Sequence, residues 1–210
     1  MNALGIHALV WACDIEPAST ELAARQTRAA GYDFLELSLH DTTQLDVEHA
    51  RAVLAEQGLG VACSRGLAFD ADISSDDPAI VARGQRLLGE SVEVAAALGA
   101  RNLCGALYSA LGKYSQPVLD CGDRLGYVHI GENHRGYLGA GAIDFGSFFH
   151  ALRRIDYRGE ITFESFSSAV VMPGLCSDLA VWRNLWSDGM DLAISARSFM
   201  QAHLRAAATI

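Results

Sequence analysis

The chain has 210 residues, half of them hydrophobic, and a formal net charge of −9, so its surface should repel a phosphate backbone and we expect no nucleic-acid partner. No apolar run is long enough to span a membrane, and residues 1–17 lack the basic and apolar regions of a signal peptide. The five cysteines are odd in number, scattered and without a CxxC pair, which predicts a protein of the reducing cytoplasm.

Short apolar runs alternate with longer helical patterns along the whole chain. The runs that predict strands are 4–11, 33–39, 60–66, 101–107, 125–130 and 159–166, and the patterns that predict helices are 19–30, 46–57, 78–98, 145–155 and 179–204. Such alternation is typical of parallel βα units, and no linker divides the chain. We therefore predict one α/β domain over residues 1–210, a TIM-barrel-like fold of about six βα units.

One interval in this series is too short. Only residues 108–124 separate the fourth and fifth strands, and Pro117 lies among them. A parallel crossover needs a dozen or more residues, usually a helix, and Pro117 leaves room for about two helical turns. A complete (βα)8 barrel takes about 250 residues, so the chain is two units short. The spacing places the missing segment near residues 116–118.

Three polar residues lie on the last two predicted strands or in the loop between them. His129 lies near the end of one strand, Glu164 lies in the apolar run Ile161–Phe166, and Arg135 lies in the loop between. Parallel α/β folds bind ligands at the carboxyl ends of their strands. A charged Glu164 is costly to bury unless it binds metal, serves as an acid or base, or pairs with Arg135. His129 is alternatively a core histidine that is satisfied by a backbone carbonyl.

Several longer motifs resemble one family. The segments HIGENHRGYLGAG (129–141), AIDF (142–145) and ITFESF (161–166) look like the C-terminal part of D-tagatose 3-epimerase and related ketose 3-epimerases. The resemblance extends to YDFLEL (32–37), GALYS (105–109) and GKY (112–114), and so covers nearly all of the chain. It implies a xylose isomerase-like barrel that acts on sugars.

The resemblance also implies roles for individual residues. Members of this family bind Mn²⁺, Co²⁺ or Mg²⁺ through two glutamates, an aspartate and a histidine. His129 resembles the histidine ligand, Glu164 resembles one glutamate ligand that is also the catalytic acid/base, and Arg135 resembles the substrate-binding arginine. The other glutamate and the aspartate, on the family's fifth and sixth strands, have no match here.

This loss affects the expected chemistry. Epimerisation at C3 removes a proton from one face of a ketose and returns one to the other face, through an enediolate that a metal stabilises. Glu164 supplies one side, while its partner is among the missing residues. We therefore expect impaired or altered activity and an incomplete metal site.

Other residues are weaker candidates for the site. Four residues are predicted to line a sugar pocket or, equally, to belong to the barrel core: His7, Trp11, Cys63 and Tyr108. Four acids near strand ends are candidate replacement ligands, although we expect solvated or structural acids: Glu36, Asp70, Asp72 and Glu132.

The leading hypothesis is a sugar isomerase/epimerase that inverts C3 of a free ketose. An alternative is a non-catalytic barrel remnant that binds a sugar or a full-length paralogue. A metal nuclease of the endonuclease IV type is disfavoured by the charge of −9. Because six strands leave two edges to cover, we also expect a homodimer.

Overall fold

Six parallel strands form one sheet in the computed structural model, which describes residues 2–71, 73, 77–105, 118–119, 121–178, 181 and 183–209. The strands lie in the order β4-β3-β2-β1-β6-β5. Their bounds are Leu4–His7 (β1), Phe34–Ser38 (β2), Gly60–Ser64 (β3), Leu103–Cys104 (β4), Tyr127–Ile130 (β5) and Glu160–Phe163 (β6). The predicted α/β fold with six βα units is confirmed.

The sheet curls until its two edge strands approach each other. Cys104 at the end of β4 has its Sγ atom 3.4 Å from His129 Nε2 on β5. The described residues of β4 and β5 do not pair as neighbours in the sheet, so side chains alone join them at this point. The result is a nearly closed barrel.

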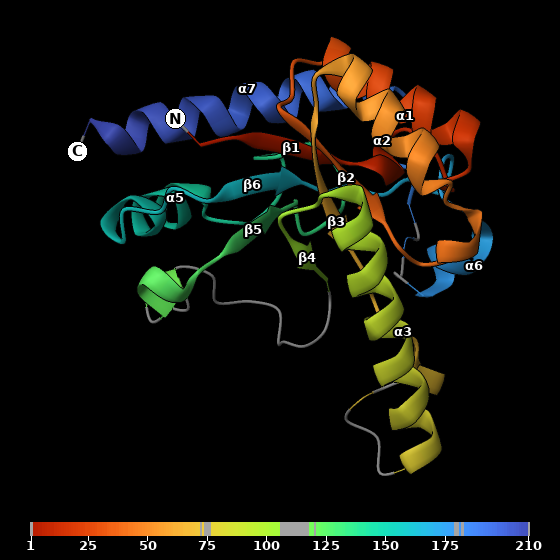
Figure 1. The fold of residues 1–210 in the computed structure, drawn as a ribbon. Helices are drawn as coiled ribbons and strands as arrows, with labels where there is room; N and C mark the ends of the chain where they lie inside the picture. Colours follow the sequence, from red (N-terminus) through yellow and green to blue (C-terminus); the bar gives the residue numbers. More distant parts are fainter. Residues whose placement is uncertain are drawn as a thin grey trace.

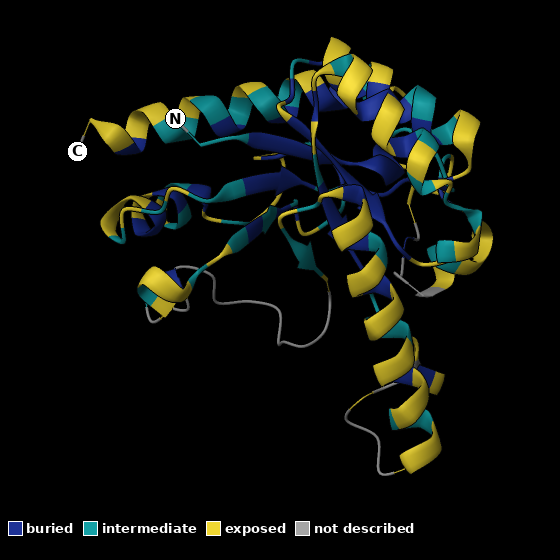
Figure 2. Ribbon diagram, viewed as in Figure 1, coloured by how far each residue is buried: buried dark blue, intermediate teal, exposed yellow. Residues whose placement is uncertain are grey.

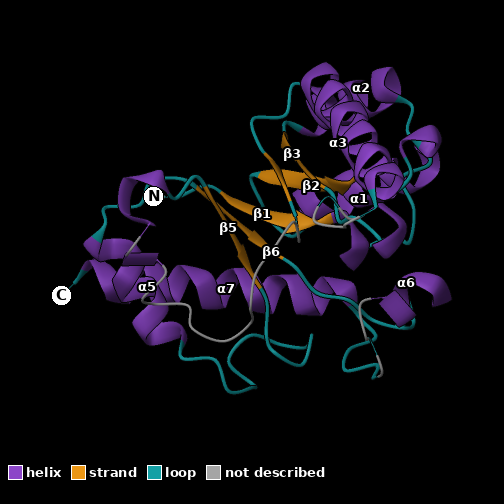
Figure 3. Cartoon of the chain, turned by 90° about the horizontal axis from the view of Figure 1, so that it is seen from below, coloured by secondary structure: helices purple, strands orange, loops and turns teal. Residues whose placement is uncertain are grey.

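Helices cover the outside of this barrel (Figures 1 and 3). Their bounds are Pro17–Ala29 (α1), Val47–Gln57 (α2), Pro78–Leu98 (α3), Phe145–Arg154 (α5), Pro173–Asp178 (α6) and Gly189–Ala208 (α7). Gly58 and Gly99 end α2 and α3 with left-handed φ values of 64° and 78°, as glycines past a helix end commonly do. None of the described helices combines the length and the apolar character that a membrane crossing requires.

Two predicted elements are wrong in their extent. The strand predicted over 4–11 ends at His7, because His7 Nδ1 accepts a hydrogen bond from the Leu9 amide and turns the chain into a short 3₁₀ helix. The helix predicted over 179–204 begins only at Gly189, because Asp188 caps it by accepting bonds from the amides of Met190 and Asp191. The segment Pro173–Asp178, which was not predicted as a helix, forms α6.

The hydrophobic core lies between the outer face of the sheet and the helices. Leu35, Leu37, Ile161 and Phe163 are fully buried there, and the central strands β1 and β2 are buried over their whole length in Figure 2. Helix α7 contributes Met200, which is equally buried. Burial of this apolar surface is the main source of stability.

The inner face of the barrel is polar by contrast. Because side chains alternate along a strand, Glu36 points inward between Leu35 and Leu37. The aromatic ring of Phe34 fills the lower interior, where an added Cβ on Gly5 would lie only 2.1 Å from the ring. The polar side chains of the interior therefore lie between the Phe34 ring and the carboxyl ends of the strands.

Candidate functional site at the carboxyl ends of the strands

Glu36 of β2 lies at the centre of the polar interior and is fully buried. Its Oε2 atom accepts hydrogen bonds from the Tyr127 hydroxyl at 2.5 Å and from His129 Nε2 at 2.7 Å. Its Oε1 atom lies 3.6 Å from His7 Nε2 and has no hydrogen-bond partner. Glu36 therefore connects β1, β2 and β5 across the barrel.

Glu36 and His129 form an internal ion pair. Burial by itself would raise the pKa of Glu36, but the charge and hydrogen bond of His129, aided by His7 and Tyr127, lower it to about 2. Burial likewise opposes charge on His129, yet Glu36 above all raises the pKa of this imidazole well above its usual value. His7 differs, because burial outweighs its acidic neighbours and lowers its pKa. These shifts favour a charged carboxylate on Glu36, a charged imidazolium on His129 and a neutral imidazole on His7.

The three residues that the sequence singled out lie together in the structure. Glu164 Oε1 is 3.8 Å from His129 Nδ1, and Glu164 Oε2 is 3.8 Å from Arg135 Nη1. The Arg135 guanidinium also lies over the Phe166 ring, 5.0 Å from its centre. Glu164 is 23% exposed, so its carboxylate borders both the interior and solvent. The predicted Arg135–Glu164 ion pair is present and does not remove Glu164 from the site.

The other predicted pocket residues fall in different places. His7 lies in the site and shares a hydrogen bond with Ser64 Oγ at 3.0 Å. Trp11 is half-buried and donates from Nε1 to Thr27 Oγ1 on α1. Cys63 lies in the hydrophobic core, because its register with Leu37 puts Ser64, and not Cys63, on the inner face. Cys63 thus takes the second of its two predicted places, the barrel core, and Tyr108 lies outside the described residues.

The four acids proposed as replacement ligands also differ in where they lie. Glu132 is a buried structural acid, as expected, because its carboxylate accepts bonds from the amides of Asn133 and Gly139. Asp70 is exposed and pairs with Arg83 at 3.0 Å, while Asp72 lies outside the described residues. Glu36 is not solvated, and it is the acid that reaches the centre of the site. The argument used for Glu164, an acid within an apolar strand, would have identified it.

Cys104, Tyr127 and Thr162 were missed as members of the site. The Tyr127 hydroxyl bonds to both Glu36 and Thr162 Oγ1. Tyr127 lies two residues before His129, so the alternation of side chains along a strand puts both on one face. Cys104 carried no local signal, because its approach to His129 depends on the curvature of the whole sheet.

A metal site of the type that the resemblance implies does not fit the described residues. That site needs three carboxylates and a histidine, an oxygen-rich set suited to Mn²⁺ or Mg²⁺. Only His129 and Glu164 match it among the residues described. Glu36, Cys104 and His129 form a different group, whose potential ligand atoms all lie within 4.8 Å of one another. We therefore assign no catalytic step to a metal.

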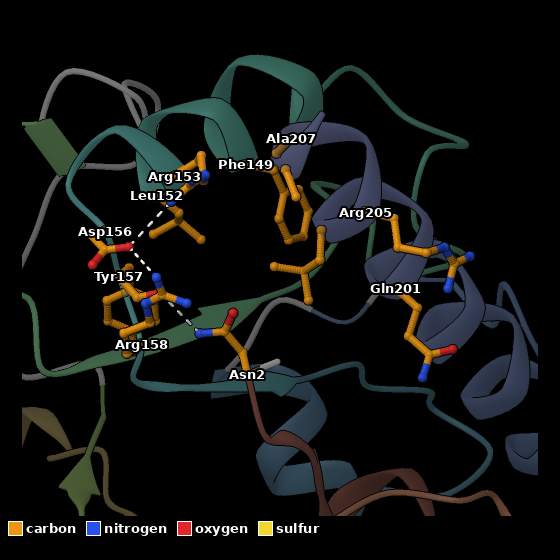
Figure 4. Close-up of a pocket in the computed structure, with 12 residues that line it drawn as sticks. Asn2, Phe149, Leu152, Arg153, Asp156, Tyr157, Arg158, Gln201, Arg205 and Ala207 are labelled. Atoms are coloured by element: carbon orange, nitrogen blue, oxygen red, sulfur yellow. Dashed lines mark hydrogen bonds and ion pairs between the residues drawn. The ribbon is translucent and has the colours of Figure 1, made fainter. Parts of the chain in front are cut away.

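A cavity of about 350 Å³ lies at the other end of the barrel, between α5, α7 and the start of β6 (Figure 4). Arg153 and Arg158 bind Asp156 at its rim, at 3.2 and 2.6 Å, and Asn2 donates to the backbone of Tyr157. These residues precede β6 and so belong to the amino end of the strands. Ligands of parallel α/β barrels bind at the carboxyl end, where Glu36 and Glu164 lie.

Comparisons with known proteins agree with this geometry. An L-ribulose 3-epimerase of Methylomonas sp. (strain DH-1) is 39% identical, with 94% of this chain and 96% of that protein covered. A ketose 3-epimerase of Arthrobacter globiformis is 34% identical, with 99% and 98% covered. The solved D-allulose 3-epimerase from Methylomonas sp. superposes with a TM-score of 0.90 at 37% identity, with 97% of this chain and 98% of that chain covered. No protein-family model matches the chain.

Fold and site together define a sugar epimerase barrel of the xylose isomerase-like class. The chain belongs to the ketose 3-epimerase family. An AP endonuclease of Brucella melitensis, at 13% identity and a TM-score of 0.59, shares only the fold.

The relatives are longer than this chain. The two alignments extend over 274 and 284 positions, whereas the chain has 210 residues. The relatives therefore contain segments without a counterpart here, in agreement with the six strands of the described sheet, two fewer than a (βα)8 barrel has. The predicted seam near 116–118 stays a prediction, because residues 116 and 117 lie outside the described part of the chain.

Proposed function

We propose that this protein is an isomerase of the ketose 3-epimerase type that acts on a free ketose, with Glu164 as its acid/base. The observation that carries the proposal is the placement of Glu164 at the carboxyl end of the barrel, 3.8 Å from both Arg135 and His129. The ketose substrates of the relatives support the same choice.

Each of the three residues has a distinct part in this proposal. The Arg135 guanidinium, held against Phe166, binds a substrate hydroxyl and orients the sugar over Glu164. The Glu164 carboxylate removes the C3 proton, and the positive charge on His129 favours the negative charge that develops in the enediolate. His129 is itself held in place by Glu36.

Inversion needs a second acid on the opposite face of the substrate. The resemblance places that acid in the segment without a match, and no described residue stands opposite Glu164 with an equivalent role. We therefore propose that proton removal by Glu164 persists, while inversion is slow relative to the longer relatives.

Solvent isotope exchange tests this proposal directly. The purified chain is incubated in D₂O with tagatose, psicose, fructose or ribulose, and deuterium at C3 is followed by NMR together with the appearance of the epimer. We expect C3 exchange that exceeds epimer formation, and we expect loss of exchange in Glu164→Gln. The matched control is Glu56→Gln, on the exposed face of α2, which should behave as the wild type. Absence of C3 exchange with all four sugars would overturn the proposal.

The alternative function, a barrel that binds a sugar or a full-length paralogue without turnover, is favoured by the missing counterparts of the relatives' segments. It predicts ketose binding by calorimetry without isotope exchange at C3. Exchange that depends on Glu164 would exclude it.

We further propose that residues 1–210 form one domain and assemble as a homodimer in the cytoplasm. β4 and β5 are the edge strands of the described sheet, where a second copy can pair, and all five cysteines are free. Light scattering should give twice the chain mass. A monomer at all concentrations would contradict the dimer.

A further inference from the structure

Among the described residues of the barrel interior, one side-chain oxygen atom has no hydrogen-bond partner. Glu36 Oε1 is buried, while the other oxygen of the same carboxylate accepts two hydrogen bonds. An unpaired buried carboxylate oxygen is costly, and natural proteins keep such a group mainly where a ligand can satisfy it. The carboxylate therefore keeps one oxygen beside its ion pair with His129 that accepts no hydrogen bond and is free to bind a cation.

Two further donor atoms surround the same carboxylate. Cys104 Sγ and Glu36 Oε2 lie 3.4 and 2.7 Å from His129 Nε2, and the three potential ligand atoms lie within 4.8 Å of one another. A tetrahedral cation with bonds of about 2.0–2.3 Å holds its ligands roughly 3.3–3.8 Å apart. Side-chain shifts of about 1 Å would be enough to admit such an ion.

We propose that Glu36, Cys104 and His129 form a binding site for a thiophilic divalent cation, best satisfied by Zn²⁺. Binding would release one proton from the Cys104 thiol and one from the His129 imidazolium. The resulting thiolate, imidazole and carboxylate are a zinc donor set, whereas Mn²⁺ and Mg²⁺ prefer oxygen. Three protein ligands leave one tetrahedral position open to water. The site shares only His129 with the one implied by the family resemblance, because Glu36 and Cys104 are its other ligands and Glu164 is not among them.

The surroundings of the three ligands support an ion at this position. His7 lies 3.6 Å from Glu36 Oε1 and the Tyr127 hydroxyl donates to Oε2, so the carboxylate is fixed in direction. Neighbouring groups that hold a ligand side chain in direction are typical of metal sites. The ligands come from β2, β4 and β5, so the ion would also join the two edge strands of the barrel.

Cobalt spectroscopy on the intact chain tests the proposal without any assay of turnover. After treatment with a chelator, the protein is titrated with Co²⁺, and a thiolate-to-cobalt charge-transfer band should appear in the near ultraviolet at one equivalent. Cys104→Ser should abolish this band. Cys121→Ser, which changes an exposed cysteine, is the matched control and should keep it.

Calorimetry measures the affinity of the site for each metal ion. Zn²⁺ should bind more tightly than Mn²⁺, and Cys104→Ser should weaken Zn²⁺ binding at least about 100-fold, since even residues around a metal ligand cost about 10–100-fold. Circular dichroism checks that each variant is folded. A folded wild type without a thiolate band, a band that survives Cys104→Ser, or a preference for Mn²⁺ would overturn the proposal. Loss of C3 exchange with metal binding retained would overturn only the proposed activity.

Discussion

The two faces of the same strands have opposite chemistry. On β2, Leu35 and Leu37 pack in the hydrophobic core while Glu36 between them occupies the polar interior. On β6, Ile161 and Phe163 pack outward while Thr162 meets Tyr127 inside. A shift of one residue therefore exchanges a packing position for a site position, and stability and chemistry are encoded in alternate residues of one strand.

The outer face should show the largest effect on stability. Phe163→Ala removes a fully buried ring and should lower the free energy of unfolding by about 3–5 kcal/mol. Urea denaturation measures this loss. Val92→Ala, at a position 57% exposed on α3, is the control and should change it by less than about 0.5 kcal/mol. Equal losses of stability from Phe163→Ala and Val92→Ala would contradict the assignment of Phe163 to the hydrophobic core.

Breaking the ion pair on the inner face should give the next largest loss of stability. His129→Gln leaves the buried Glu36 without its cation and should cost about 3 kcal/mol, near the lower end of the range for such pairs because His129 is 26% exposed. The double variant Glu36→Gln with His129→Gln removes both charges and should be more stable than His129→Gln alone. Simple additivity of the two single losses would argue against the pair.

Loss of one hydrogen bond should cost more stability when its acceptor is a charged carboxylate on the inner face than when it is a neutral carbonyl. Tyr127→Phe removes the bond to the Glu36 carboxylate and should cost about 1.5–3 kcal/mol. Tyr157→Phe, whose hydroxyl donates to the neutral carbonyl of Glu160, should cost only about 1 kcal/mol. The reverse order in chemical denaturation would mean that Glu36 is not ionised.

The smallest expected effect is on the pH dependence of stability, and it comes from His203 in the outer layer of helices. His203 stacks on Phe149 at 5.3 Å, and burial, with the charge of His150, lowers its pKa from 6.5. Because the unfolded chain then binds the proton more readily, this residue's contribution to stability is present above about pH 6.5 and is lost as the pH falls. The melting temperature of His203→Gln should therefore fall less between pH 7.5 and about pH 5.5 than that of the wild type. An unchanged pH slope would contradict this.

Local patterns predicted much of the fold and part of the site. The helix over 78–98 is found with the same bounds, and His129 and Glu164 were identified because polar residues in apolar strands need a reason. The late start of α7 was not predicted, since apolar spacing continues through 179–188 and only the cap at Asp188 sets the boundary. Cys104 could not be found locally, because its contact with His129 joins the edge strands β4 and β5.

The contact between Cys104 and His129 has a consequence for how the chain could be divided. Strands β1 to β4 come from the first half of the sequence and β5 and β6 from the second, and the backbone bonds between these halves run between β1 and β6, on the far side of the barrel from that contact. A cut between Gly105 and Val118 would leave that ladder and the packing of α7 intact. Two separate polypeptides, ending and beginning there, should therefore reassemble into one barrel when mixed.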